Sequence, residues 1–411
     1  MGSDGRVVVI GGGAAGFFGA IAAAECGASD VLILEAGKEV LTKVRISGGG
    51  RCNVTHGCYD PRELTAGYPR GSRSLIGPFH RWQVADTVDW FAQHGVELKT
   101  EEDGRMFPVT DDSQTVVDCL TAAARELGVE WRTGSGVARV RRRPDGGFAV
   151  ETDQGDEIVA RCLLVATGGI RSGAARRPAA VLGHEFEPPV PSLFTFQIED
   201  ARLQDLQGVS VREAMVRVGK LEASGPLLVT HGGLSGPAVL KVSAWGAREL
   251  AECGYEFELR VSWAGGLGVD ELRGRFERER NAHGTRKVVG RSVVDGITRR
   301  LWQSLCAAAG IGEAQTWARL TREESRKLAG ELTDGRYAVR GKSLNKDEFV
   351  TCGGVHLKDV NFKTMESRLV PGVFFAGEVL DIDGVTGGFN FQAAWTTGRI
   401  AGEGIGRRSG S

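Results

Sequence analysis

The first 35 residues contain the feature that most constrains the fold of this chain, a glycine-rich turn between two apolar segments. Val7–Ile10 is a run of apolar β-branched residues, which is typical of a buried parallel strand. It leads into Gly11–Gly16, spaced as GxGxxG, and then into a helix predicted over about 17–26. A second apolar run, Val31–Leu34, ends at Glu35. This order of strand, glycine turn, helix, strand and acidic residue predicts a dinucleotide-binding βαβ unit.

Each glycine of this fingerprint has an expected physical role. Gly11 permits the sharp turn out of the strand, and Gly13 lets the backbone approach a pyrophosphate. Gly16 allows the helix to lie close to the sheet, and the helix N-terminus offers unpaired N–H groups to the phosphates. Glu35 is placed to accept hydrogen bonds from the adenosine ribose hydroxyls, and its charge would repel a 2′-phosphate.

Composition narrows the class of protein. The 411 residues carry a net charge of -1, and no stretch approaches the roughly 18–20 apolar residues of a membrane span. The first residues run straight into the predicted strand, so no signal peptide is expected. The eight cysteines are scattered without a CxxC pair, and the histidines lack metal-ligand spacing. We therefore expect a cytoplasmic protein with no disulfide framework and no metal site.

A second glycine-rich segment, Lys43–Asn53, follows the fingerprint. Its three consecutive glycines lie between Lys43 and Arg51, which suits a backbone loop wrapped around an extended anionic ligand. The alternative is a solvated basic loop. The cysteine within it, Cys52, and a later one, Cys352, lie in segments expected near the cofactor; both redox chemistry and simple burial of the thiols stay open.

Segments far along the chain favour FAD over NAD. The ranges Gly136–Val140, Phe148–Thr152 and Ile158–Arg161 read as a short β-meander, which leads into the buried strand and glycines of Cys162–Gly169. A meander followed by ATGG is the second nucleotide-contact element of large FAD domains.

The C-terminal part supplies a further strand, Val373–Ala376, ending at Gly377 and Glu378, and Glu378 is placed to bind ribityl hydroxyls. Gly387–Asn390 then opens a helix predicted to run to about residue 402. The N-terminus of this helix is expected to face the flavin pyrimidine edge, where it would stabilise the negative charge of reduced flavin.

These segments together resemble the BaiN/YhiN-like (HI0933-type) flavoproteins, which include aminoacetone oxidase-like enzymes, over nearly the whole chain. The motifs that carry the resemblance are VIGGGAAG (9–16), SGGGRCNVT (47–55), GRMFP (104–108), ATGG (166–169), PSLFTF (191–196), THGGLSGPAVLKVS (230–243), TCGGV (351–355) and the block 364–402. The stretch 170–182, IRSGAARRPAAVL, departs from the family, most members of which carry a longer loop ending in GSTGDGY.

The resemblance implies an α/β fold with a discontinuous Rossmann-like FAD-binding domain over 1–190 and 350–411. The insert, 191–349, is expected to contain a β-barrel-like subdomain over about 191–265 and 335–349 and a helical subdomain over about 266–334. Residues 270–346 hold seventeen Lys and Arg against ten Asp and Glu, a net charge of +7. Such a surface is either an RNA footprint or a set of solvated helix faces of mixed charge.

The residues expected to bind FAD come from all of these segments. They are Gly11, Gly13, Ala14, Ala15, Gly16, Glu35, Ala36, Lys43, Ser47, Gly48, Gly49, Arg51, Cys52, Asn53, Val137, Ala166, Thr167, Gly168, Gly377, Glu378, Gly388, Phe389, Asn390, Gln392 and Ala393.

His231 is the catalytic candidate, because an imidazole titrates near neutral pH and can supply the proton that accompanies a hydride. Its segment, Thr230–Pro237, is either a second phosphate cradle for NAD(P)H or a turn without ligand. The chain is expected to be an FAD-dependent oxidoreductase, reduced by NADH, NADPH or its own substrate, that acts on a small unsaturated or amine-bearing molecule. The alternatives are a flavin-dependent reductase of uridine in ribosomal RNA and a non-catalytic electron carrier. Oligomeric state is left open.

Overall fold

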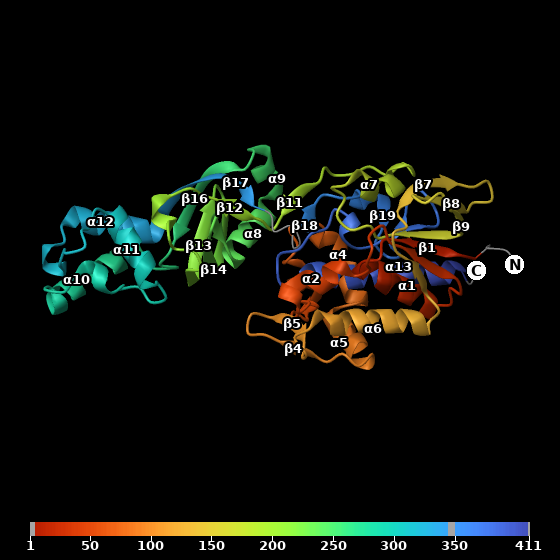
Figure 1. Ribbon diagram of the computed structural model, residues 1–411, viewed down its shortest axis with the longest axis horizontal. Helices are drawn as coiled ribbons and strands as arrows, with labels where there is room; N and C mark the ends of the chain where they lie inside the picture. Colours follow the sequence, from red (N-terminus) through yellow and green to blue (C-terminus); the bar gives the residue numbers. More distant parts are fainter. Residues whose placement is uncertain (1–4, 344–349, 410–411) are drawn as a thin grey trace. The chain divides into compact units, whose positions relative to one another are not determined.

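The computed structural model describes residues 5–343 and 350–409 (Figure 1). Of these, residues 5–191 with 350–409 form one compact unit, called here the nucleotide unit, and residues 192–343 form a second, called the insert unit. The domain limits set from the sequence stay predictions. Their last barrel residues, 344–349, lie outside the described residues.

A seven-stranded sheet forms the centre of the nucleotide unit, in the order β19-β20-β21-β10-β1-β2-β6. Five neighbouring strands are parallel, and β1 lies between β2 and β10, with Val7 opposite both Val31 and Cys162. All residues of β1, β2, β10 and β21 are buried, as expected for parallel strands covered on both faces. The strands are β1 (Val7–Ile10), β2 (Val31–Leu34), β6 (Glu130–Arg132), β10 (Cys162–Val165), β19 (Val360–Asn361), β20 (Glu366–Ser367) and β21 (Val373–Phe375).

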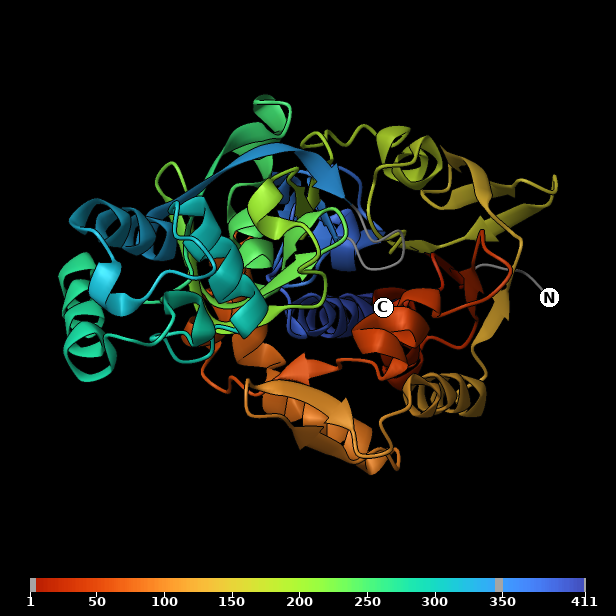
Figure 2. The ribbon, with the colours of Figure 1, turned by 60° about the vertical axis from the view of Figure 1, so that its left-hand side comes forward.

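Three smaller sheets complete this unit, in the orders β3-β5-β4, β7-β8-β9 and β11-β18. In both views the β7–β8 hairpin of the meander projects from the unit (Figures 1 and 2). The strands are β3 (Thr55–His56), β4 (Leu98–Thr100), β5 (Arg105–Pro108), β7 (Val137–Arg142), β8 (Phe148–Thr152), β9 (Glu157–Ala160), β11 (Val190–Ser192) and β18 (Val350–Cys352).

Helices α1 and α13 lie against each other in the nucleotide unit, and glycine makes their contact possible. A Cβ atom placed on Gly398 would lie 2.8 Å from the Ala15 carbonyl oxygen, and one on Gly402 would lie 2.4 Å from that of Gly19. The two backbones therefore touch. The helices of this unit are α1 (Ala14–Glu25), α2 (Thr42–Gly50), α3 (Pro61–Thr65), α4 (Ser72–Arg81), α5 (Val84–Gln93), α6 (Ser113–Glu126), α7 (Gly173–Ala180) and α13 (Phe389–Ser409).

The insert unit is built on a closed antiparallel barrel in the order β12-β15-β14-β13-β16-β17, with α10, α11 and α12 gathered at one end (Figure 1). Alternate residues of β17 are buried, because one face of each strand lines the barrel core. The elements are β12 (Thr195–Gln197), β13 (Ser210–Val218), β14 (Leu221–Thr230), β15 (Gly233–Ser235), α8 (Pro237–Trp245), α9 (Ala247–Glu252), β16 (Glu256–Ser262), α10 (Val269–His283), α11 (Arg299–Ala308), α12 (Arg322–Asp334) and β17 (Gly335–Ser343).

The predicted α/β class, with a Rossmann-like unit, a barrel and a helical part, is confirmed. Two local differences stand out. Residues 43–46 of the Lys43–Asn53 segment, which was read as a loop, are helical, and the last helix reaches Ser409 instead of about residue 402. Within the described residues, no helix is long and apolar enough to cross a membrane.

Candidate active site

The site is organised by the carboxyl edge of the parallel sheet. Strands β1, β2, β10 and β21 run in the same direction, so the loops that follow them leave from one edge. The chain passes from β1 to β2 on one side, while β10 lies on the other side of β1. This reversal of strand order creates the crevice in which open α/β sheets bind ligands.

The fingerprint glycines of this edge divide into two kinds. A Cβ atom on Gly11 would lie 2.3 Å from the Ala166 carbonyl oxygen, and one on Gly16 would lie 1.9 Å from that of Gly11. Both glycines are therefore required by the packing of the protein itself. A Cβ atom on Gly13 would meet nothing within 4 Å, and Gly13 has an ordinary extended backbone. Space is left over Gly13 alone of the three, as a cradle for a ligand phosphate requires.

The first turn of α1 adds hydrogen-bond donors beside that space. The first intrahelical bond is made by Phe17, whose N–H donates to the Gly13 carbonyl, so the N–H groups of Ala14, Ala15 and Gly16 precede the helical ladder. No side chain caps this terminus and no acidic residue lies in its first turn. The first turn of the helix therefore presents positive potential with no side-chain cap or acidic residue of its own.

Glu35 follows β2 and is fixed by two backbone donors. Its carboxylate accepts hydrogen bonds from the N–H of Gly12 (2.7 Å) and of Gly37 (2.6 Å). Its own carbonyl accepts from the Ser135 N–H (2.8 Å), which brings the start of the meander beside Glu35 and Ala36. Val137, at the start of β7, is buried there. The predicted adenosine-side residues are thus brought together.

The residues after β10 and β21 meet the N-terminal half of α2. Lys43 Nζ lies 2.7 Å from Glu378 Oε2, and Glu378 Oε1 accepts from the Thr351 N–H at 2.8 Å. A Cβ atom on Gly168 would lie 4.0 Å from the same carboxylate, so Lys43, Gly168 and Glu378 form one cluster. Of the other predicted residues here, Ala166 and Thr167 follow β10, and the Thr167 hydroxyl donates to the Ala175 carbonyl in α7 (3.0 Å).

The hydrogen bond from Thr167 to Ala175 holds part of 170–182, the segment that departs from the family pattern. Residues 173–180 form α7, which begins at the Ser172 cap and packs beside β7. Arg177 also donates to the Ala138 carbonyl of β7 at 3.3 Å. The segment therefore lies over the meander.

The C-terminal end of α2 is a turn of glycines in left-handed conformations. Gly48, Gly49 and Gly50 have φ values of +59°, +70° and +85° and are exposed, and a Cβ atom on Gly49 would meet nothing within 4 Å. Ser47, just before them, has left the helical region with ψ 152°. At Gly49 and Gly50 the backbone is therefore open to a ligand, as at Gly13, whereas a Cβ atom on Gly48 would lie 2.9 Å from the Phe107 ring.

Two predicted residues of this turn have their side chains engaged within the protein. Arg51 donates to Glu101 (2.7 Å), and its guanidinium lies 3.9 Å from the centre of the Phe107 ring. Its charge is therefore compensated away from the glycines. Cys52 is fully buried, and burial raises the pKa of its thiol to about 12. A protonated thiol is a poor nucleophile, so the geometry favours a packing role. Cys352 is buried as well.

The start of α13 is joined to the same turn by Asn53. In the amide orientation that satisfies both of its groups, Asn53 Oδ1 accepts from the Gly388 N–H at 3.0 Å. A Cβ atom on Gly388 would lie 2.3 Å from the Thr55 carbonyl oxygen, so this position requires glycine. The segments SGGGRCN and GGFN, more than 300 residues apart, are thus in direct contact.

The polar side chains of the first α13 turn are used inside the protein. The Asn390 amide makes two hydrogen bonds to the Gly384 backbone, both 2.9 Å. The Gln392 amide is buried and bonded to Thr55 (2.6 Å) and Thr87 (3.0 Å). Any contact of these two residues with a cofactor would come from their backbone. Phe389 and Ala393 are buried, and Gly377 donates to Thr397 (2.9 Å), which ties β21 to α13.

Sequence reasoning missed three residues that hold this region. Tyr68 donates to the Phe389 carbonyl (2.5 Å), Arg70 pairs with Asp383, and the His56 ring stacks on Phe389 with its Nδ1 3.0 Å from the Gly387 carbonyl. The histidines lack metal-ligand spacing, so nothing in the sequence distinguishes His56. The segment Tyr68–Gly71 has Pro and Gly as its signal for an ordered turn, but nothing in it indicates the partner.

His231 lies in the insert unit, at the tip of a hairpin between β14 and β15, and is exposed. The glycines around it serve the barrel: a Cβ atom on Gly233 would lie 2.2 Å from the Phe196 carbonyl oxygen, and one on Gly236 would lie 2.7 Å from that of Pro226. These glycines permit close strand contacts, so the interpretation of Thr230–Pro237 as a phosphate cradle has no support in the geometry.

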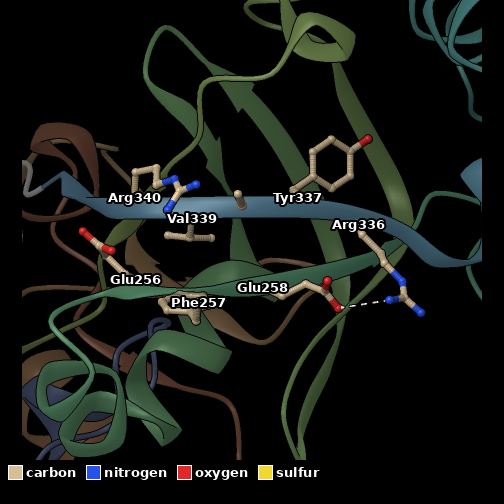
Figure 3. Close-up of a pocket in the computed structure, with 8 residues that line it drawn as sticks. Glu256, Phe257, Glu258, Arg336, Tyr337, Val339 and Arg340 are labelled. Atoms are coloured by element: carbon tan, nitrogen blue, oxygen red, sulfur yellow. Dashed lines mark ion pairs between the residues drawn. The ribbon is translucent and has the colours of Figure 1, made fainter.

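A hollow of about 470 Å³ lies on the barrel over β16 and β17 (Figure 3). Its charged residues are of both signs, and Glu258 lies 3.8 Å from Arg336. It holds no fingerprint residue. Among the described residues, no group of three His, Cys, Asp or Glu side chains is placed to hold a metal ion.

Known proteins resemble the chain over nearly its whole length. The relatives include the ribosomal RNA dihydrouridine synthase of Escherichia coli (strain K12), 30% identical over 400 residues and covering 95% of both chains. The 3-dehydro-bile acid delta(4,6)-reductase of Clostridium scindens is 28% identical over 417 residues, covering 98% of this chain and 99% of the relative. Both relatives are named as enzymes, which leaves the electron-carrier alternative without support.

Solved structures agree on the fold. The 3-ketosteroid-delta4-(5alpha)-dehydrogenase of Rhodococcus jostii RHA1 matches 99% of this chain and 98% of its own, with a TM-score of 0.51 at 16% identity. The 3-ketosteroid delta1-dehydrogenase of Sterolibacterium denitrificans matches 98% of this chain and all of its own, with a TM-score of 0.52 at 12% identity. Residues 5–404 match the family described as HI0933-like protein Rossmann domain. The chain belongs to this family, as its motifs predicted, and is an FAD-dependent oxidoreductase.

Proposed function

We propose that this enzyme reduces a carbon–carbon double bond that is conjugated to a carbonyl group. The observation that carries the proposal is the carboxyl edge, where the open space over Gly13, the fixed Glu35 and the starts of α1 and α13 suit an extended dinucleotide. The names of the two relatives describe reductions of this kind, in uridine and in an oxo steroid. FAD supplies the hydride chemistry when bound.

Different residues at this edge would bind different parts of FAD. The first turn of α1 would bind the pyrophosphate, and Glu35 the adenosine ribose. Lys43 and Glu378 would lie along the ribityl chain, and the exposed backbone of Gly48–Gly50 would lie beside the ring.

We infer that the electron donor is NADH or NADPH, bound at the flavin site. Within residues 5–343 and 350–409 there is one parallel sheet with one complete fingerprint, and the insert unit is an antiparallel barrel with helices. A nicotinamide nucleotide would therefore use the same crevice as the substrate, in alternation.

Anaerobic half-reactions test this function. The protein loaded with FAD is mixed with NADH or NADPH, and the reduced form is then mixed with ribosomal RNA transcribed in vitro or with a 3-oxo-delta(4,6) steroid. We expect reoxidation by one acceptor with gain of two hydrogen atoms in the product, measured by mass spectrometry. Reoxidation by oxygen alone, with both acceptors unchanged, would contradict the proposal.

We propose RNA as the acceptor, because the insert unit carries a fixed basic surface over residues 284–300. Its five basic side chains are all exposed, and none is in an ion pair within the part of the chain that the structure describes. They are Arg286, Lys287, Arg291, Arg299 and Arg300. The segment contains one acidic residue, Asp295. The backbone is held in place, since the Val288 carbonyl accepts from the Trp302 indole at 2.8 Å.

Removing part of this charge should weaken RNA binding in a salt-dependent way. Arg286→Gln with Lys287→Gln is expected to lower the slope of log affinity against log salt by roughly one to two, since each lost phosphate contact contributes about 0.7–0.9. Arg139→Gln with Arg142→Gln, an equal charge change at exposed positions of the meander, is the control. Equal slopes for both variants and the wild type would leave the small-molecule alternative.

His231 is the proton donor that we propose, and its position at an exposed hairpin tip makes a clean test possible. His231→Ala should leave FAD affinity and stability unchanged and slow reoxidation by the acceptor about 10²-fold, the usual effect of losing a general acid. His80→Ala, at an exposed position of α4, is the control. An unchanged rate would show that solvent or another group supplies the proton.

A further inference from the structure

The 380–388 loop joins the end of the β21 region to α13, and one of its side chains differs from all the others in being exposed. Every residue of the loop is buried except Thr386, which is exposed. The loop is irregular in structure, although an irregular segment normally runs over the surface. Such burial requires that its backbone and side chains be held by other parts of the unit.

The first support comes from the turn at 67–71. Arg70 Nε lies 2.6 Å from Asp383 Oδ1, and a second hydrogen bond joins Nη2 to Oδ2. The side chains of this pair are 11% and 0% exposed. The Val385 N–H donates to the Gly67 carbonyl at 2.8 Å. A buried two-pronged ion pair and a backbone bond therefore fix the middle of the loop.

A second support holds the end of the loop. The Gly387 carbonyl is 3.0 Å from His56 Nδ1, and Asn390 bonds both the N–H and the carbonyl of Gly384. Gly388 is pressed against the Thr55 carbonyl and receives the Asn53 side chain. Thr386 is therefore held between fixed neighbours, unlike an exposed residue at a mobile loop tip.

The position of Thr386 relates it to the proposed chemistry. It lies two residues before Gly388, at the start of α13, and the loop begins just after Glu378 at the carboxyl edge of the sheet. Contacts of Gly398 with Ala15 and Gly19 show that α13 begins about six residues beyond the start of α1, roughly 9 Å at 1.5 Å per residue. If the adenosine of a dinucleotide lies at Glu35 and its pyrophosphate at the start of α1, the remaining half would extend toward Thr386.

We propose that the Thr386 hydroxyl donates a hydrogen bond to the carbonyl oxygen of the substrate. This inference rests on the proposed function. The carbon β to the carbonyl accepts a hydride, the electron pair of the double bond moves toward the carbonyl oxygen, and a proton then adds to the α carbon and restores the carbonyl. The electrons come from a reduced nicotinamide nucleotide by way of the cofactor. A fixed donor at the oxygen stabilises the charge that develops there.

Two variants at this position separate the hydroxyl from the shape of the side chain. Thr386→Val removes the hydroxyl and keeps the branched shape, and Thr386→Ser keeps the hydroxyl. We expect Thr386→Val to slow reoxidation by the ribosomal RNA transcript about 10²-fold, as for other lost oxyanion donors, with Thr386→Ser close to wild type. Thr100→Val, at an exposed position of β4, is the control.

Further readouts distinguish contact with substrate from support of the cofactor site. The FAD dissociation constant, thermal unfolding of the FAD-free protein and anaerobic reduction by NADPH should all be unchanged in Thr386→Val. Weaker FAD binding, equal slowing of both half-reactions, or wild-type reoxidation would each overturn the assignment. If the wild type transfers hydride to neither RNA nor the steroid, the proposed function fails before Thr386 is tested.

Discussion

Gly13→Val is expected to give a folded protein that no longer retains FAD. A Cβ atom at this position would meet nothing within 4 Å, and the backbone there, at φ -89° and ψ -170°, is one that valine adopts readily. Folding should therefore cost no more than the loss of a favourable N-cap residue, about 1 kcal/mol. The added side chain fills the space through which a phosphate would approach the α1 backbone, so the affinity for FAD should fall by orders of magnitude.

Gly16→Ala provides the contrast, since the two glycines are three residues apart in the same motif. Its Cβ atom would lie 1.9 Å from the Gly11 carbonyl oxygen, which is backbone and cannot turn away. This variant should lose stability even without FAD. Urea unfolding of the FAD-free proteins and fluorescence titration with FAD measure the two effects. Gly13→Val that binds FAD normally would show that the open space is not the pyrophosphate site.

The central part of the fold could be predicted because its signals are local. The runs Val7–Ile10, Val31–Leu34 and Cys162–Val165 are short and apolar throughout, which is typical of strands covered on both faces. The meander was predicted within one or two residues for the same reason, since turn residues separate its alternating strands.

The sequence did not predict which distant side chains form ion pairs and hydrogen bonds with each other. Arg51 was expected to face an anionic ligand because glycines precede it, yet its partner is Glu101, fifty residues later. Gln392 carries an amide near the predicted flavin site, but that amide is bonded to Thr55 and Thr87. Charge and hydrogen-bonding capacity are visible in a sequence, whereas the competition among partners is decided by tertiary packing.

The closing strand of the barrel was expected only through the family resemblance, which placed it within 335–349. This strand, β17 (Gly335–Ser343), pairs with β12 and β16 after the helical part, so it lies about 140 residues from β12 and no local sequence pattern connects the two. The glycines of Thr230–Pro237 resembled a phosphate cradle for a related reason. A glycine required by strand packing, such as Gly233 against Phe196, has the same letter in a sequence as one required by a ligand.

The contact between α1 and α13 explains how the two ends of the chain build one site. Gly398, Gly402 and Gly406 are four residues apart and therefore lie on one face of α13. A Cβ atom on Gly406 would lie 2.3 Å from Cys26 Cβ, at the far end of α1. Contacts with α1 advance in the same direction along both helices, so the helices are parallel and both N-termini face the carboxyl edge.

Gly402→Ala is expected to destabilise the protein by about 3 kcal/mol, at the upper end of overpacking effects, because the new methyl group meets backbone. Its Cβ atom would lie 2.4 Å from the Gly19 carbonyl oxygen and 2.7 Å from the Ala23 nitrogen. Relief requires α13 to move away from α1, which also shifts the Gly388 turn. FAD affinity should therefore fall together with stability.

Gly330→Ala, inside α12, is the matched control. A Cβ atom there meets nothing within 4 Å, so the higher helix propensity of alanine should stabilise α12 by about 0.5–1 kcal/mol and leave FAD binding unchanged. Urea unfolding measures the stability of both variants, and titration with FAD measures their affinity for the cofactor. If Gly402→Ala is as stable as the wild type, α13 is not held at α1 by close backbone contact. If it is destabilised and still binds FAD with wild-type affinity, the position of α13 along α1 does not set the geometry of the site. In that case, moving the start of α13 away from the Ser47–Asn53 turn has no effect on the cofactor.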